Sequence, residues 1–277
     1  LRSALSRCLG AVEASELGGE THGMLLTVID RREGEIAGAG ERRYVNVDVT
    51  SPKGIKRALR IKLVRSGMID LLASPHLSDT SAVFGDVAAY DPRDTNVARG
   101  RAFALFRHPV HDAAARYSQL LSAAHETGAP FDLTLLEYAR SDLVEENPLV
   151  RSLTGEFLSA HKKKGAGPVT AQHVEVAKEV VRRKVLVGLS EFMPLSVERF
   201  ERYFGWGAAR REQRTCLNEA AEGVANVLAG ETVQGLHPET DEYAELARRN
   251  WADVQLYHYT RVLFEEQAAL LPPVAEP

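Results

Sequence analysis

Residues 102–110 read Ala-Phe-Ala-Leu-Phe-Arg-His-Pro-Val, and this stretch decides the fold. Its first five residues are apolar and uncharged, which predicts a short buried strand. Pro109 favours the first turn of a helix, because its fixed φ angle suits that position. Apolar side chains then recur at helical spacing, at residues 110, 113, 114, 117, 120 and 121. The stretch is therefore a strand, a turn and a helix, with Arg107 and His108 in the turn.

Outward from this stretch, apolar runs alternate with helical patterns. Further strands are predicted at residues 24–29, 45–49, 68–73 and 185–189. Helices are predicted at residues 1–10, 52–66, 196–204, 208–229 and 239–270, with short helices between 131 and 160. Two more are predicted from Pro109 with apolar residues as far as Leu121, and from a Thr170 cap with Val174, Ala177 and Val181 facing inward, whereas residues 78–100 are predicted to be mostly loop. Strands that alternate with helices indicate an α/β fold, so we expect one domain over residues 1–277, a three-layer sandwich with a mostly parallel sheet.

Composition excludes several classes of protein. The 277 residues carry a net charge of −4, whereas a general nucleic-acid-binding protein is usually basic. The sequence contains no run of 18 apolar residues, so we predict no transmembrane segment. The chain also lacks the glycine-rich dinucleotide and Walker-type phosphate loops, the Gly-x-Ser-x-Gly elbow and the His-Glu-x-x-His zinc motif. Its two cysteines, Cys8 and Cys216, are too few for a Cys-rich zinc site, and whether they pair stays open.

Two polar residues end predicted strands, where open α/β sheets bind their ligands. Arg107 follows residues 102–106, and a guanidinium there can hold a phosphate through two parallel hydrogen bonds. Alternatively, Arg107 caps backbone carbonyls or pairs with a carboxylate. His76 follows residues 68–73 and is a candidate proton acceptor or a hydrogen-bonded structural histidine. His108 and His111 have a spacing that can bind a metal, but no third ligand is evident, so we predict no metal site.

Several segments resemble the PAPS-dependent carbohydrate sulfotransferases, the group that includes uronyl 2-O-sulfotransferases and their algal relatives. Residues 101–110 are similar to that group's strand, turn and helix. Asn147-Pro-Leu-Val-Arg151-Ser-Leu-Thr-Gly155 is similar to its Asn-x-x-x-Arg-x-Leu-x-Gly segment. Residues 177–206 resemble a further stretch that ends in Phe-Gly-Trp. The ordered set covers most of residues 44–206.

The resemblance implies a P-loop nucleotide-kinase-like fold and transfer of a sulfuryl group from PAPS (3′-phosphoadenylyl sulfate) to a carbohydrate hydroxyl. It implies that Arg107 binds the 3′-phosphate of this donor and that His76 is the catalytic base. It also implies residence in the Golgi lumen. Residues 1–10 look like the helix that follows the family's phosphate loop, so we expect that loop and its strand before Leu1. A sheet edge without them should be covered by protein partners.

Two residues depart from the family's 3′-phosphate segment, Arg-x-Pro-x-x-Arg-x-x-Ser. Asp112 replaces the second arginine, and Ala115 replaces the serine whose hydroxyl would bond the phosphate. Ser118 lies one turn further and is a poor substitute. These departures leave activity open. The alternative to an active sulfotransferase is a catalytically impaired homologue that serves as a structural or binding subunit of a larger assembly.

Overall fold

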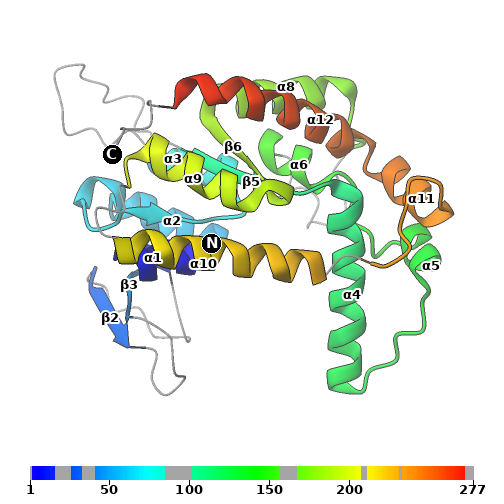
Figure 1. The fold of residues 1–277 in the computed structure, drawn as a ribbon, viewed down its shortest axis with the longest axis horizontal. Helices are drawn as coiled ribbons and strands as arrows, with labels where there is room; N and C mark the ends of the chain where they lie inside the picture. The colour runs from blue at the N-terminus through cyan, green and yellow to red at the C-terminus, as the bar shows by residue number, and fades with distance from the viewer. Residues whose placement is uncertain are drawn as a thin grey trace. The chain divides into compact units, whose positions relative to one another are not determined.

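The computed structural model describes residues 2–15, 26–32, 41–84, 102–155, 167–206, 211–230 and 233–271. The chain divides into two compact units, each considered by itself below. Unit 1 comprises residues 1–101 and 206–220, and unit 2 comprises residues 102–205 and 221–277. Both contain helices and small, mostly parallel sheets (Figure 1), which confirms the predicted α/β class.

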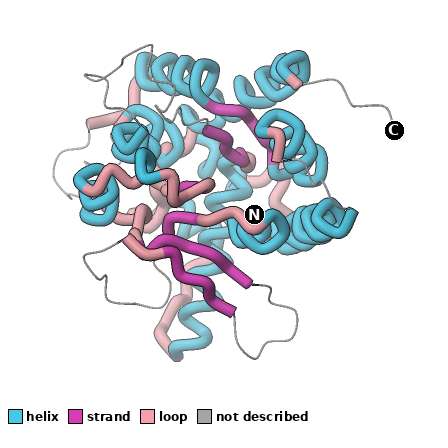
Figure 2. Tube along the Cα trace, turned by 90° about the vertical axis from the view of Figure 1, so that its left-hand side faces the viewer, coloured by secondary structure: helices cyan, strands magenta, loops and turns pink. Residues whose placement is uncertain are grey.

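The sheet of unit 1 has four short strands in the order β2-β3-β1-β4. Figure 2 draws the described strands in magenta. β1 (Glu13–Ser15) is parallel to both β3 (Glu41–Asn46) and β4 (Leu71–Leu72), whereas β2 (Val28–Arg32) is antiparallel to β3. Three helices, α1 (Arg2–Leu9), α2 (Pro52–Arg60) and α3 (Leu77–Phe84), belong to the same unit. Its core packs apolar side chains in and next to the strands on those of α2 and the turn after it: Val12, Ala14, Val45, Val47, Val49, Ile55, Ala58 and Leu63.

Several predicted boundaries in unit 1 are wrong. The strand predicted at 68–73 is reduced to two residues, and the one predicted at 45–49 is paired only through Asn46. β2 continues three residues beyond the predicted strand end at residue 29, through Asp30, Arg31 and Arg32, because β3 pairs with it to Arg32. The first residues of the loop predicted at 78–100 form helix α3 instead. Residues 85–100 lie outside the described residues, and so do residues 24 and 25 of the strand predicted at 24–29.

A disulfide answers the question that the two cysteines left open. Cys8 on α1 is bonded to Cys216 on α10 (Arg211–Gly230), with Cα atoms 5.6 Å apart and a sequence separation of 208. Both cysteines belong to unit 1. α10 contributes its first half to unit 1 and its second half, from residue 221, to unit 2.

Unit 2 is built on two parallel strands, β5 (Ala102–Phe106) and β6 (Val185–Leu189), which pair along their whole length. Both strands have the predicted bounds. The helices of the unit are α4 (Pro109–Thr127), α5 (Leu135–Arg140), α6 (Pro148–Thr154), α8 (Ala171–Lys184), α9 (Met193–Phe204), α11 (Asp241–Arg249) and α12 (Trp251–Glu266), with 3₁₀ turns η3 (Ser190–Phe192) and η4 (Gln267–Leu270). The helix predicted over 239–270 is thus broken at Asn250.

Side chains supply hydrogen bonds to β6. The Gln267 amide accepts from Val187 N–H and donates to the Val185 carbonyl, both at 2.8 Å, as a neighbouring strand would. Ser196 was predicted to begin a helix, but α9 begins at Met193 and Ser196 is buried. Its hydroxyl lies 2.9 Å from Leu189 N and 3.0 Å from the Leu189 carbonyl. Ser196 therefore fixes the carboxyl end of β6 rather than a helix terminus.

α6 and α12 cap each other's N-termini. The Asn147 side-chain oxygen accepts from Ala252 N–H at 2.9 Å, at the start of α12. In return, the Asp253 carboxylate accepts from the Leu149 and Val150 N–H groups at 2.9 and 2.8 Å, in the first turn of α6. Free N–H groups at a helix start need such acceptors when they are buried. Asn147, part of the family-like segment, therefore joins two helices.

The described strands form two sheets, whereas the sequence predicted one. The three-layer arrangement and the single domain over 1–277 stay predictions. Within the described ranges, no helix is both long and apolar enough to cross a membrane.

Candidate functional site

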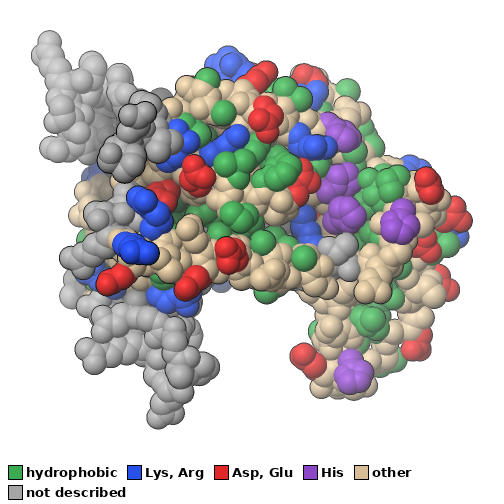
Figure 3. Space-filling view, in the orientation of Figure 1, with side chains coloured by type: hydrophobic (Ala, Val, Ile, Leu, Met, Phe, Trp, Pro, Cys, Tyr) green, Lys and Arg blue, Asp and Glu red, His purple; other side chains and the backbone are tan. Residues whose placement is uncertain are grey.

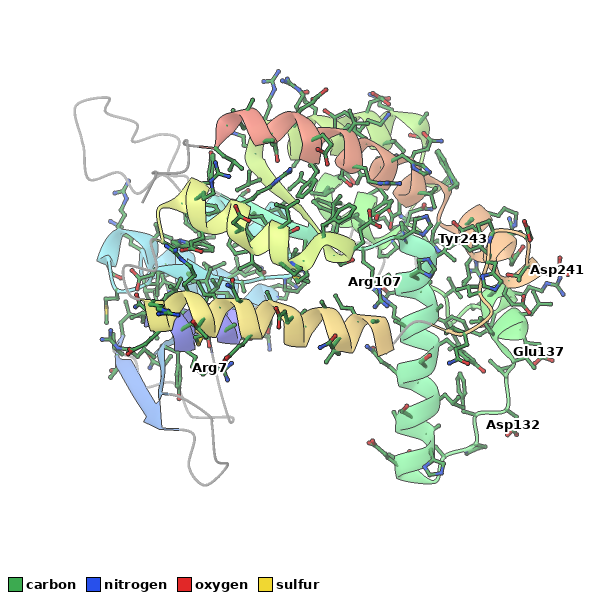
Figure 4. The ribbon with its side chains drawn as sticks, in the orientation of Figure 1. Arg7, Arg107, Asp132, Glu137, Asp241 and Tyr243 are labelled. Carbon is green, nitrogen blue, oxygen red and sulfur yellow. A yellow bond between two sulfur atoms is a disulfide. The ribbon has the colours of Figure 1, made fainter. Side chains whose placement is uncertain are left out.

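The candidate site lies in unit 2, at the carboxyl ends of β5 and β6. Arg107 and His108 follow β5 directly, and Glu191 lies two residues beyond the end of β6. α4 begins at Pro109, so its first free N–H groups belong to the same edge. In Figure 4, Arg107 lies at the N-terminal end of α4, and Tyr243 lies on α11. Strand ends and a helix N-terminus together are the usual place for a ligand in α/β proteins.

Arg107 contacts a helix end within its own unit. Its Nη2 donates to the Leu228 carbonyl at 3.1 Å. Leu228 lies in the last turn of α10, where carbonyl groups lack a partner in the helix and the helix dipole favours a cation. Carbonyl capping, the alternative considered for Arg107, is therefore present. A guanidinium carries five N–H donors, so this bond uses one of them.

A pair of histidines occupies the turn after β5 and the first turn of α4. The rings of His108 and His111 have centroids 5.3 Å apart. His108 stacks on Tyr243 at 5.9 Å and meets the edge of Tyr257 at 5.0 Å. Its Nε2 lies 3.3 Å from the Tyr243 hydroxyl. Figure 3 shows histidine side chains gathered on the face where α4 begins beside α12.

Both imidazoles are neutral at pH 7. Burial lowers the pKa of His108 to about 4, and repulsion from the nearby basic side chains of His111, His258 and Arg261 would oppose its protonation further. Burial also lowers the pKa of His111, and Arg107 adds to this effect while Glu191 opposes it. The Nδ1 atoms of His108 and His111 are buried, and neither has a hydrogen-bond partner among the described residues.

Glu191 connects the end of β6 to α12. Its carboxylate accepts a 2.9 Å hydrogen bond from the Tyr257 hydroxyl and lies 3.5 Å from Arg261 Nε. Burial raises the pKa of Tyr257, and the hydrogen bond to Glu191 and its charge raise it further. Tyr257 thus stays protonated and donates to Glu191. The site combines two cations, a carboxylate and two neutral imidazoles between tyrosine rings.

His76 lies in unit 1 and Arg107 in unit 2, so the two predicted site residues belong to different units. His76 is half-buried and follows β4. Its N–H donates to Ser74 Oγ at 3.1 Å, and its carbonyl accepts from Thr80 N–H at 2.9 Å in the first turn of α3. The backbone of His76 therefore starts that helix.

The positions that depart from the family's phosphate segment are occupied by other contacts. Asp112 accepts from Arg116 Nε at 3.3 Å, and Arg116 also pairs with Glu145. Ala115 is buried, and the Ser118 hydroxyl donates to the Ala114 carbonyl at 3.3 Å. The Asp112 charge is thus partly offset by a neighbouring cation.

No group of three or more His, Cys, Asp or Glu side chains that could hold a metal occurs in the described part of the chain. Sequence reasoning missed four members of the site: Glu191, Tyr243, Tyr257 and Arg261. His108 and His111 were noticed, but only as a candidate metal pair. Their position directly after a predicted strand is the sequence signal that could have identified them as members of a ligand site.

Comparisons with known proteins give no relative for this chain: no protein-family model, no curated protein and no solved structure matches it.

Proposed function

We propose that the chain is a sulfotransferase-like protein that transfers a sulfuryl group from PAPS to a carbohydrate hydroxyl. The observation that carries the proposal is the place of Arg107, at the carboxyl end of a parallel strand and two residues before α4. A guanidinium beside a helix N-terminus suits a doubly charged phosphate, because both favour negative charge.

The residues at this edge fit the chemistry of such a donor. Arg107 would hold the 3′-phosphate, and the first N–H groups of α4 would face the same negative charge. PAPS, when bound, supplies an activated sulfuryl group. The protein's part is then to orient donor and acceptor and to accept the hydroxyl proton, as in phosphoryl transfer. On the resemblance, His76 would accept that proton.

The second candidate, a catalytically impaired homologue that acts as a binding or structural subunit, is favoured by a specific set of contacts. Arg107 is bonded to the Leu228 carbonyl, and Ala115 offers no hydroxyl to a phosphate. Loss of one neutral hydrogen bond costs about 0.5–1.5 kcal/mol. The Asp112 carboxylate would add repulsion, which its pairing with Arg116 reduces.

The disulfide bears on location. Disulfides persist in oxidising compartments and are rare in the cytosol. The Cys8–Cys216 bond therefore supports a lumenal or extracellular location, in keeping with the Golgi lumen that the resemblance implies.

Calorimetric titration with adenosine 3′,5′-bisphosphate, the desulfated donor, tests the phosphate site. Arg107→Ala should weaken this binding by roughly 10- to 100-fold, the value of a hydrogen bond to a charged group. Adenosine 5′-monophosphate, which lacks the 3′-phosphate, is the matched ligand, and its affinity should not change. Ala115→Ser should tighten bisphosphate binding by about threefold to tenfold. Equal bisphosphate affinity in wild type and Arg107→Ala would remove Arg107 from the site.

Transfer of ³⁵S from labelled PAPS to desulfated polysaccharides then separates the two candidate functions. Transfer of ³⁵S to an acceptor supports the active sulfotransferase. Bisphosphate binding without transfer to any acceptor supports the impaired homologue.

A further inference from the structure

We propose that the last turn of α10 is an autoinhibitory element, which competes with the phosphate of a ligand for Arg107. The inference rests on the proposed function and adds a regulation of the same site. Leu228 lies in that last turn, and its carbonyl accepts a 3.1 Å hydrogen bond from Arg107 Nη2. Both residues belong to unit 2. A phosphate that approaches Arg107 therefore meets an acceptor that is already in place.

The Leu228 carbonyl contacts the part of the guanidinium that a phosphate needs most. A guanidinium offers a phosphate two pairs of parallel N–H groups, one from Nε and Nη2 and the other from Nη1 and Nη2. Since Nη2 belongs to both pairs, an acceptor on it uses a hydrogen of one pair and stands beside the other. The carbonyl also lies at the end of α10 where the helix dipole places partial negative charge. A doubly charged phosphate on Arg107 would thus be repelled until the last turn moves away.

The second half of α10 is packed loosely enough to move. Its first half is anchored by the disulfide at Cys216 and by the buried side chain of Leu217. Beyond residue 221, every residue of the helix is partly or fully exposed, and Val227 is 62% exposed. A Cβ atom at Gly223 would meet nothing within 4 Å, so packing does not require this glycine, which weakens the helix. A segment that buries so little apolar surface unfolds locally at low cost.

These features make binding and unwinding compete. In the chain without ligand, Arg107 is bonded to Leu228 and α10 extends to Gly230. When a phosphate binds, its oxygens replace the carbonyl on Nη2, and residues 223–230 leave the helix. The apparent affinity is then lowered by the fraction of time that the last turn spends away from Arg107. Any interaction that unwinds this segment would raise the affinity for the donor without touching the site.

Calorimetric titration with adenosine 3′,5′-bisphosphate compares wild type, Asn226→Pro and the matched control Asn226→Ala. Asn226 is exposed, and a proline there removes a helix hydrogen bond and clashes with the preceding turn, which should release the last turn. We expect Asn226→Pro to bind the bisphosphate roughly threefold to 30-fold more tightly, whereas Asn226→Ala should bind it no more tightly than wild type does. Adding Asn226→Pro to Arg107→Ala should change nothing, because the contested guanidinium is gone.

Amide hydrogen exchange on the wild-type protein keeps the test decisive if Asn226→Pro folds poorly by circular dichroism. Saturating bisphosphate should speed exchange at residues 223–230 by roughly tenfold or more and leave residues 213–220 unchanged. Equal bisphosphate affinity in wild type and Asn226→Pro, or unchanged exchange at residues 223–230, would overturn the inference. The proposed function would still stand if Arg107→Ala weakened binding. Absence of bisphosphate binding in both wild type and Asn226→Pro would overturn the proposed phosphate site, and this inference with it.

Discussion

The parallel pair in unit 2 and the sheet in unit 1 differ in how far each is encoded by local sequence. β5 and β6 have five residues each, pair in full register and have the bounds predicted from their apolar runs. In unit 1, β1 has three residues and β4 two, and β2 carries Asp30, Arg31 and Arg32. A fully apolar strand is recognisable by itself, whereas a short or charged strand exists because a neighbour pairs with it.

The two units also differ in the long-range interactions that stabilise them. Unit 1 has a covalent link between α1 and α10. Unit 2 relies on buried side chains that bond to backbone groups far away in sequence, such as Gln267 on β6 and Asp253 on α6. In addition, the Arg199 guanidinium covers the Phe264 ring at 3.6 Å. Unit 1 should therefore be sensitive to reducing agents, and unit 2 to changes in charge and volume.

The largest expected effect is the loss of the disulfide. A crosslink between positions 208 apart restricts the unfolded chain strongly, so reduction should lower the free energy of unfolding by up to about 5 kcal/mol. Urea unfolding followed by circular dichroism, with and without dithiothreitol, measures this. The double variant Cys8→Ser/Cys216→Ser is the control, because reductant should not change its midpoint. A wild-type midpoint that is the same with and without dithiothreitol would contradict the prediction.

The second effect is a pH dependence that belongs to unit 2. Burial raises the pKa of Asp253 from 3.8 to about 6, although hydrogen bonds from Val150 and Leu149 N–H oppose this. The folded chain therefore holds this proton more tightly than the unfolded chain does. The resulting stabilisation is fully present below pH 3.8 and is lost as the pH rises through 6, which amounts to roughly 3 kcal/mol.

Asp253→Asn should remove this part of the pH dependence. Urea unfolding at several pH values between 4 and 7 compares the slopes of wild type, Asp253→Asn and the control Asp132→Asn, which changes an exposed carboxylate. Asp132→Asn should keep the wild-type slope. Identical slopes in wild type and Asp253→Asn would show that Asp253 titrates alike in the folded and unfolded chain.

The smallest effect tests the packing of β6 on α9. A Cβ atom at Gly188 would lie 2.5 Å from Phe200 Cζ and 2.9 Å from Leu105 Cδ2. Gly188→Ala should therefore destabilise the protein by about 1–3 kcal/mol in thermal or urea unfolding. Gly223→Ala is the matched control, since a Cβ atom there meets nothing within 4 Å on α10, and alanine in a helix is favoured by roughly 0.5–1 kcal/mol. Equal midpoints for the two variants would contradict the packing that the structure describes.

Local signals predicted much of the fold correctly. Ser51 and Pro52 start α2, where the Ser51 side chain accepts from Gly54 N–H, and Gly67 follows the 3₁₀ turn with a φ of 66°. Thr170 starts α8, and Pro109 lies in the first turn of α4. Caps and prolines act within a few residues, so their effect can be read from sequence. α3 was missed, because its residues mix polar and apolar types without a clear period.

Only part of the candidate site could be predicted from the sequence. Arg107, His108 and His111 share one local motif, so their place at a strand end followed from the pattern of residues 102–110. Tyr243, Tyr257 and Arg261 come from helices more than 130 positions later, and no local pattern connects them to that motif. The strand-end position of Arg107 was predictable, whereas the aromatic and charged surroundings of the histidines were not.

The sequence alone determined the α/β class, the two long strands of unit 2, the starts of α2, α4 and α8, and the residues that end β5. These depend on side-chain periodicity and on φ preferences, which act over a few residues. Only the tertiary structure decided the pairing of Cys8 with Cys216, the reciprocal caps of α6 and α12, and the neutral state of the two histidines. Those features depend on burial and on contacts between segments that are distant in sequence, and the free energy of a buried group is set by whichever neighbours the fold brings to it.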